Sequence, residues 1–139
     1  MDLITQRSHT MANADTRTLY GEVDADGRIP FWRAPSLWAA AAGATQVEVE
    51  VDRLAILDEV VWFGGPNNVQ PTIRLIAERA RDINEAILDY PIIMLGNGNI
   101  VDGAHRVAKA YLLKKRTIRA VIIDKMPEPD GWINNSETS

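Results

Sequence analysis

The sequence predicts a single α/β (α+β) domain, with a small mixed β-sheet and helices packed against it. Gln46–Asp52 alternates apolar and acidic residues, which is the pattern of a strand with one buried face. Pro71–Asn84 repeats apolar residues at helical spacing. Tyr90–Asp124 reads as strand, tight turn, strand, helix and strand. The chain has 139 residues, 46% of them hydrophobic, which fits one domain with a real core.

The N-terminal part of the chain is predicted to contain a leader, a hairpin and a short helix. Residues 1–16 are polar and lack periodicity, so we expect a flexible leader before a domain that covers residues 17–125. Tyr20–Ile29 is predicted to be a hairpin, because Asp26-Gly27 is a turn signal between apolar flanks. Pro35–Gly43 is predicted to be a helix, since proline suits its first turn and glycine its C-terminal stop.

The middle of the chain is predicted to contain a half-buried strand, a loop and an amphipathic helix. In Gln46–Asp52 the valines are expected to face inward and the glutamates outward. A helical turn is expected at Leu54–Leu57, and residues 62–68 are expected to form a loop with an aromatic entrance. In Pro71–Asn84 the residues that fall near one apolar face are Ile73, Ile76, Ala77, Ala80 and Ile83.

The C-terminal part of the chain completes the predicted sheet. Residues 96–99 are expected to join the strands Ile92–Leu95 and Ile100–Val101 as a hairpin turn. Ala104–Lys115 is the expected helix that follows, and Ile118–Ile123 is an apolar strand of the kind found in the centre of a sheet. Residues 126–139 are expected to form an extended polar tail, of which only Trp132 docks back on the domain.

Composition and charge exclude several classes of function. The chain has no cysteine, which excludes disulfides, thiolate metal sites and cysteine nucleophiles. Its net charge of −4 disfavours a duplex-DNA partner, because general DNA binders present a basic surface. No apolar run is long enough for a signal peptide or a membrane span, so we expect a cytoplasmic protein without a membrane partner. A homodimer is left open.

One short motif carries most of the functional signal. Asp102–Arg106 reads Asp-Gly-Ala-His-Arg and lies where a predicted strand gives way to a helix. The first turn of a helix leaves backbone N–H groups without intrahelical partners, and the positive helix end adds to their pull on an anion. His105 and Arg106 add side-chain donors. The motif therefore predicts phosphate recognition at Gly103, Ala104, His105 and Arg106.

The order strand, turn, strand, DGAHR, helix and strand resembles the ParB/sulfiredoxin-like fold. The match covers roughly Val47–Asp124 and is strongest over Pro91–Asp124. In that superfamily a Gly-x-x-Arg or Gly-x-His-Arg element at a helix start binds nucleotide phosphates. The tryptophan-rich leading part and the Pro-Glu-Pro-Asp near the end resemble small single-domain ParB-like proteins. The resemblance implies ATP, ADP or CTP as the ligand.

Three groups of relatives imply different activities. Sulfiredoxins carry Gly-Gly-Cys-His-Arg, but the cysteine position is Ala104 here, so their repair chemistry is not carried over. Chromosome-partitioning ParB proteins bind CTP and use a separate helix-turn-helix domain, which we do not expect in this chain. ADP-dependent free-serine kinases carry Asp-Gly-His-His-Arg, which is similar to Asp102–Arg106, and this likeness implies phosphoryl transfer if a base is present.

Several residues have alternative roles at this stage. Asp102 is a helix cap, a base that activates a hydroxyl, or a ligand of a Mg²⁺ ion that bridges it to phosphate. Arg106 binds the ligand or only pairs with Asp102. Asp58 and Glu59 precede the aromatic loop and are further candidates for the base. Thr72 either forms a second anion site at its helix start or only caps that helix.

The leading hypothesis is a nucleotide-binding protein, with phosphoryl transfer from ATP or ADP to an unknown small molecule as its extension. The alternative is a non-catalytic, ParB-like module that binds a nucleotide or a partner. Nuclease activity is the weakest reading, because no cluster of metal-binding carboxylates is evident. Two histidines and no cysteine also predict no structural metal site.

Overall fold

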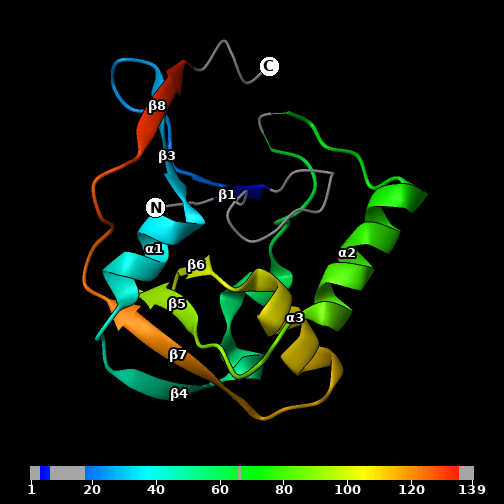
Figure 1. Ribbon diagram of the computed structural model, residues 1–139. Coiled ribbons are helices and arrows are strands. Elements are labelled where there is room, and N and C mark those ends of the chain that lie inside the picture. The colour runs from blue at the N-terminus through cyan, green and yellow to red at the C-terminus, as the bar shows by residue number, and fades with distance from the viewer. Residues whose placement is uncertain (1–3, 7–17, 66, 135–139) are drawn as a thin grey trace.

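The computed structural model describes residues 4–6, 18–65 and 67–134, which are arranged as shown in Figure 1. Over these residues the protein is a mixed α+β domain, as the sequence predicts. The strands are β1 (Ile4–Gln6), β2 (Thr18–Tyr20), β3 (Arg28–Arg33), β4 (Gln46–Glu50), β5 (Ile92–Leu95), β6 (Ile100–Asp102), β7 (Thr117–Ile123) and β8 (Gly131–Asn134). The helices are α1 (Ala34–Ala41), α2 (Ile73–Glu85) and α3 (Ala104–Leu112), with the 3₁₀ turns η2 (Val51–Arg53) and η3 (Ala55–Asp58).

The sheet predicted from the C-terminal half is small and mixed. Its strand order is β4-β7-β5-β6, and β7 pairs antiparallel with β4 but parallel with β5. The apolar strand predicted at Ile118–Ile123 is therefore central, as expected. The β5–β6 hairpin turns at Gly98, whose φ of +95° lies in the left-handed region that glycine tolerates.

Both faces of this sheet are covered, because successive side chains of a strand point to opposite sides. One face packs against α1 and strands β2 and β3 through Leu19, Trp32, Leu37, Ile93, Leu95, Val101, Val121 and Ile123. The other packs against α3 and the two 3₁₀ turns through Val51, Leu54, Ile92, Met94, Val107, Ala110, Ile118 and Ala120. Helices α1 and α3 thus lie on opposite sides of the sheet, and β6 leads directly into α3.

A second, antiparallel sheet has the order β1-β2-β3-β8, which the sequence did not predict. The hairpin predicted at Tyr20–Ile29 is present as β2 and β3. Strand β1 lies within the expected flexible leader, so that expectation is wrong for Ile4–Gln6. Residues 1–3 and 7–16 of that leader lie outside the described residues. The physical reason for the difference is backbone pairing with β2, which requires no apolar periodicity.

The tail expected after residue 125 also belongs to the fold. Strand β8 pairs with β3, so Trp132 docks back as expected, but its neighbours dock with it. Trp32 donates its indole N–H to the carbonyl of Pro127 at 2.7 Å. The Asp130 carboxylate accepts the backbone N–H of Arg33 at 2.6 Å and the hydroxyl of Ser36 at 2.7 Å. The tail thereby fixes the start of α1; residues 135–139 lie outside the described residues.

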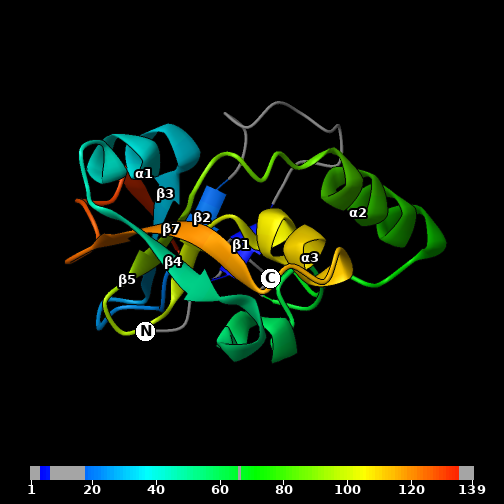
Figure 2. The ribbon, with the colours of Figure 1, turned by 90° about the horizontal axis from the view of Figure 1, so that it is seen from below.

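Helix α1 follows β3 directly and packs against β6 and β7 of the mixed sheet. Its first turn contains a proline and it stops before Gly43, whose φ is +79°, as the sequence predicts. Helix α2 lies at the outer edge of the molecule beside α3, as Figures 1 and 2 show from two directions. In the described part of the chain, no helix is long and apolar enough to span a membrane.

Helix α2 is turned opposite to what its amphipathic pattern suggests. Ile73 and Ile76 are 89% and 51% exposed, whereas Arg79 and Asp82 are buried against α3. A surface helix ordinarily turns its apolar stripe to the core. Here the buried face is held by an ion pair of 3.4 Å between Arg79 and Asp82, with the imidazole of His105 on α3 next to it. Polar contacts therefore override the apolar pattern.

Candidate functional site

The Asp-Gly-Ala-His-Arg motif begins α3 with a glycine that no other residue replaces without strain. Gly103 is the N-cap residue, with a φ of +114°. A Cβ atom built on it would lie 2.6 Å from Cγ2 of Ile92 and 3.1 Å from a guanidinium nitrogen of Arg106. The glycine thus permits both the left-handed turn and the close approach of β5 to the start of α3. The N–H groups of Ala104 and its neighbours lie in the first turn, where a helix leaves donors without intrahelical partners.

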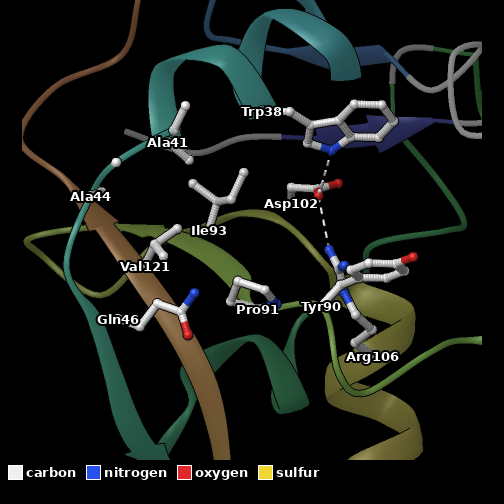
Figure 3. A pocket seen from close by; sticks show the side chains of 12 residues that line it. Trp38, Ala41, Ala44, Gln46, Tyr90, Pro91, Ile93, Asp102, Arg106 and Val121 are labelled. Atoms are coloured by element: carbon white, nitrogen blue, oxygen red, sulfur yellow. Dashed lines mark hydrogen bonds and ion pairs between the residues drawn. The ribbon is translucent and has the colours of Figure 1, made fainter.

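Asp102 and Arg106 form a buried ion pair at the junction of β6 and α3. A guanidinium N–H of Arg106 donates to Oδ2 of Asp102 at 2.9 Å, and the indole N–H of Trp38 donates to the same oxygen at 3.2 Å. Figure 3 shows the carboxylate between these two donors. The side chains of Arg106 and Asp102 are 12% and 6% exposed. The pairing that the sequence offered as an alternative role for Arg106 is therefore present.

These three side chains line a cavity of about 620 Å³ between α1, the mixed sheet and the start of α3. Its remaining wall contains Tyr90 and a run of small residues, 41–44, which leave the space open. A volume of this size lies within the range of roughly 300–1,000 Å³ that is usual for small-molecule sites. The cavity is mainly apolar and has one charged pair on its wall (Figure 3), so it suits a ligand with an apolar part and a polar end.

His105 points away from this cavity, toward α2. Its ring stacks on the indole of Trp62, with ring centroids 4.7 Å apart and an interplanar angle of 16°. Its Nε2 lies 3.8 Å from Oδ2 of Asp82. Consecutive residues of the motif therefore lie in two different environments. Arg106 contacts Asp102 on the α1 side, and His105 contacts Trp62 on the α2 side.

The α2 side contains several buried polar atoms that lack a hydrogen-bond partner among the described residues. Trp62 Nε1, Glu78 Oε2 and Arg79 Nε are buried without a hydrogen-bond partner among the described residues. Such atoms are uncommon in folded proteins because each costs desolvation energy. The buried interface between α2, α3 and the Trp62 loop thus contains polar atoms whose desolvation is not offset by hydrogen bonds among the described residues.

The structure does not bring the remaining predicted residues to the cavity. Asp58 and Glu59 are exposed at the end of η3, whose Ile56 and Leu57 pack on the α3 side of the sheet. Thr72 caps α2, since its hydroxyl oxygen accepts the N–H of Leu75 at 3.2 Å. Of the eight residues proposed from the sequence, only Asp102 and Arg106 are among those that line the cavity.

Sequence reasoning missed the aromatic wall of the site. Trp38 lies in an alanine-rich helix, where the sequence signals only helix formation, and its partner Asp102 is 64 residues away. Tyr90 precedes β5 and is 60% exposed. The one available signal was a tryptophan among alanines. Because alanine side chains are short, they cannot cover the indole ring, so the ring is available to line a cavity.

The described residues contain no group of three or more histidine, cysteine, aspartate or glutamate side chains arranged to hold a metal. Asp102 is the single carboxylate among the residues that line the cavity. Magnesium is often bound by one or two carboxylates together with substrate phosphates, so this one carboxylate fits a metal that arrives with a nucleotide.

Comparison with protein-family models, curated proteins and solved structures gives no significant match. The ParB/sulfiredoxin-like assignment therefore stays a prediction that rests on the order of the elements and the Asp-Gly-Ala-His-Arg motif.

Proposed function

We propose that the protein is a nucleotide-binding module whose ligand occupies the cavity between α1 and the start of α3. The observation that carries this proposal is the placement of Arg106 in one cavity with two aromatic side chains, Trp38 and Tyr90. The guanidinium suits a phosphate, and indole or phenol rings suit the flat face of a base.

The Asp102 carboxylate must be reconciled with a phosphate close by. Its Oδ2 accepts from both Arg106 and Trp38. When Arg106 turns toward a phosphate, Trp38 remains as a donor to the carboxylate, which lowers the cost of breaking the ion pair. A Mg²⁺ ion between the carboxylate and the phosphate would also offset their repulsion. For this reason the binding measurements need both conditions, with Mg²⁺ and without it.

Phosphoryl transfer from ATP or ADP to a small molecule is the second candidate. It is favoured by one observation, that Asp102 alone among the proposed bases lines the cavity. Against it, the Oδ2 of Asp102 already accepts two hydrogen bonds, so its first role is to orient Arg106. Phosphorus NMR with pools of amino acids, sugars and nucleosides decides between the two. A bound nucleotide that stays intact with every pool, with Mg²⁺ present, leaves a binding module.

The proposal predicts that a nucleotide raises the melting temperature and that Arg106 contributes to its affinity. A thermal-shift screen with ATP, ADP, CTP, GTP and AMP identifies the ligand, because a ligand that binds only the native state must stabilise it. Calorimetric titration of Arg106→Lys should then show affinity reduced by about tenfold or more, since charge-assisted bonds contribute roughly 1.5–3 kcal/mol. Lysine keeps the charge beside Asp102 but loses the planar fork of donors.

Arg106→Ala is a second variant, but it leaves the buried Asp102 carboxylate without its cation and is expected to lower stability as well. Arg81→Ala is the matched control, because Arg81 is exposed on α2 and is not among the residues that line the cavity. If no nucleotide raises the melting temperature, the proposed function is wrong. If a nucleotide binds both Arg106 variants as tightly as wild type, Arg106 is not part of its site.

A further inference from the structure

We propose that Gln46 determines which base the bound nucleotide carries, and that this base is adenine. The inference rests on the proposed function, because it assigns the far end of the same cavity. Gln46 begins β4 and is exposed to a ligand in the cavity that it helps to line. It supplies the one amide side chain among the described residues of that lining. Among the described residues this amide has no hydrogen-bond partner of its own.

The strand register places Gln46 and Asp102 at opposite ends of one row across the mixed sheet. The row runs from Gln46 on β4 to Val121 on β7, Ile93 on β5 and Asp102 on β6. All four residues line the cavity. Neighbouring strands lie about 4.8 Å apart, so the ends of the row are separated by about 14 Å. Arg106 is bound to Asp102 at one end, and Gln46 therefore lies at the other, as Figure 3 shows.

Between these two ends the cavity is lined by apolar side chains. The sheet contributes Ile93 and Val121, and Ala41 comes from α1 (Figure 3). Apolar surfaces of this kind suit the flat face of a base, because burial of apolar area is favourable. A nucleotide whose phosphate lies on Arg106 therefore extends its base over these residues toward Gln46.

The chemistry at the Gln46 end selects the base. The polar edge of a base needs partners, because donors and acceptors that are buried without them weaken binding. The amide of Gln46 offers an acceptor and a donor side by side, which match the amino group and a ring nitrogen of adenine. Guanine is read by arginine or lysine and cytosine by a carboxylate. Ala44 and Val121, which line the cavity beside Gln46, carry no charge, so adenine fits this end best.

The experiment compares four nucleotides that have the same phosphates and differ only in the base, which is adenine, guanine, cytosine or uracil. Calorimetric titration of the full chain should show the adenine nucleotide bound about tenfold more tightly than the other three, as expected for one bidentate pair. Gln46→Leu should remove this preference, because leucine has neither a donor nor an acceptor. Gln46→Glu should shift the preference toward guanine, because a carboxylate accepts from the N–H groups on the edge of that base.

Two further variants separate recognition of the base from other effects. Glu48→Leu changes the next residue on the same face of β4, which is not among those that line the cavity, and should leave the base preference unchanged. Arg106→Lys should weaken all four nucleotides by a similar factor, because it acts on the phosphate. If none of the four nucleotides binds, the proposed function fails together with this inference. If they bind but another base is preferred, or if the ratios between bases are the same in wild type and Gln46→Leu, this inference alone is overturned.

Discussion

At the scale of single residues, one carboxylate oxygen organises the proposed site. Oδ2 of Asp102 accepts from Trp38 on α1 and from Arg106 on α3, so it links two helices that lie on opposite sides of the sheet. A buried ion pair adds little net stability, but the loss of one partner is costly because it leaves the other charge unpaired. The ion pair thus fixes the positions of Arg106 and Trp38 more than it stabilises the fold. A binding site requires side chains that are held in such fixed positions.

Gly103→Ala is predicted to destabilise the fold for two reasons that a control separates. The φ of +114° strains any residue with a Cβ, and that Cβ would lie 2.6 Å from Cγ2 of Ile92. Gly98→Ala introduces the strain alone, since Gly98 has a φ of +95° and no atom within 4 Å of the added carbon. Strain should cost about 1–2 kcal/mol at either position, and overpacking about 1–3 kcal/mol more at Gly103.

Urea unfolding of the two glycine variants and wild type measures both differences in the free energy of unfolding. Equal losses at the two positions would show that β5 yields to the added methyl group, and that the close approach of Ile92 does not require glycine.

At the scale of elements, the start of α1 depends on a residue far along the chain. Arg33, the N-cap residue of α1, has no side-chain cap of its own. Asp130 accepts the N–H of Arg33 instead, as the glutamate of a capping box does for its N-cap. The same carboxylate accepts from Ser36. Since α1 carries Trp38, the C-terminal segment helps to place one wall of the cavity.

Asp130→Asn is predicted to lower stability at neutral pH by about 1 kcal/mol or less, as expected for an exposed cap. The N–H of Arg33, followed by the hydroxyl of Ser36, lowers the pKa of Asp130 below the usual 3.8. A carboxyl group whose pKa is lower in the folded state stabilises the fold above its unfolded pKa and loses that contribution as pH falls through the folded value. The difference between wild type and variant should therefore persist at pH 7 and 5 and shrink below about 3.8.

Urea unfolding at pH 7, 5, 4 and 3 measures this difference in the free energy of unfolding. Asp124→Asn is the control, because Asp124 is an exposed aspartate in the segment between β7 and β8. A difference for Asp130→Asn that stays constant down to pH 3 would show that its charge does not stabilise α1.

The elements that the sequence predicted well are those with a local cause. The β5–β6 hairpin follows from its glycines, α1 from its proline and Gly43, and β7 from its apolar run. The orientation of α2 was not predictable from its apolar pattern, because it depends on His105, a residue from another helix. Strands β1 and β8 were missed for a related reason, since their pairing with β2 and β3 is between residues distant in sequence.

At the scale of the whole molecule, α1 and the second sheet cover one face of the mixed sheet, while α3 covers the other face and α2 lies beside α3 (Figures 1 and 2). The motif lies at the boundary and directs Arg106 to one side and His105 to the other. The sequence predicted that the motif residues act together. It could not predict that consecutive side chains of one helical turn, about 100° apart, enter separate environments.

The central claim is that a nucleotide occupies the cavity on the Arg106 side of this boundary. The chain has four tryptophans, and each indole N–H gives its own cross-peak in a proton–nitrogen NMR spectrum. Trp38 lines the cavity, Trp62 lies on the His105 side, and Trp132 lies in the second sheet. The Trp38 peak is assigned by its loss in Trp38→Phe.

Titration with the nucleotide found in the thermal-shift screen should move the Trp38 indole peak along a saturable curve and leave the Trp132 peak in place. Movement of the Trp62 peak with no change at Trp38 would contradict the account, because it would place the ligand between α2 and α3.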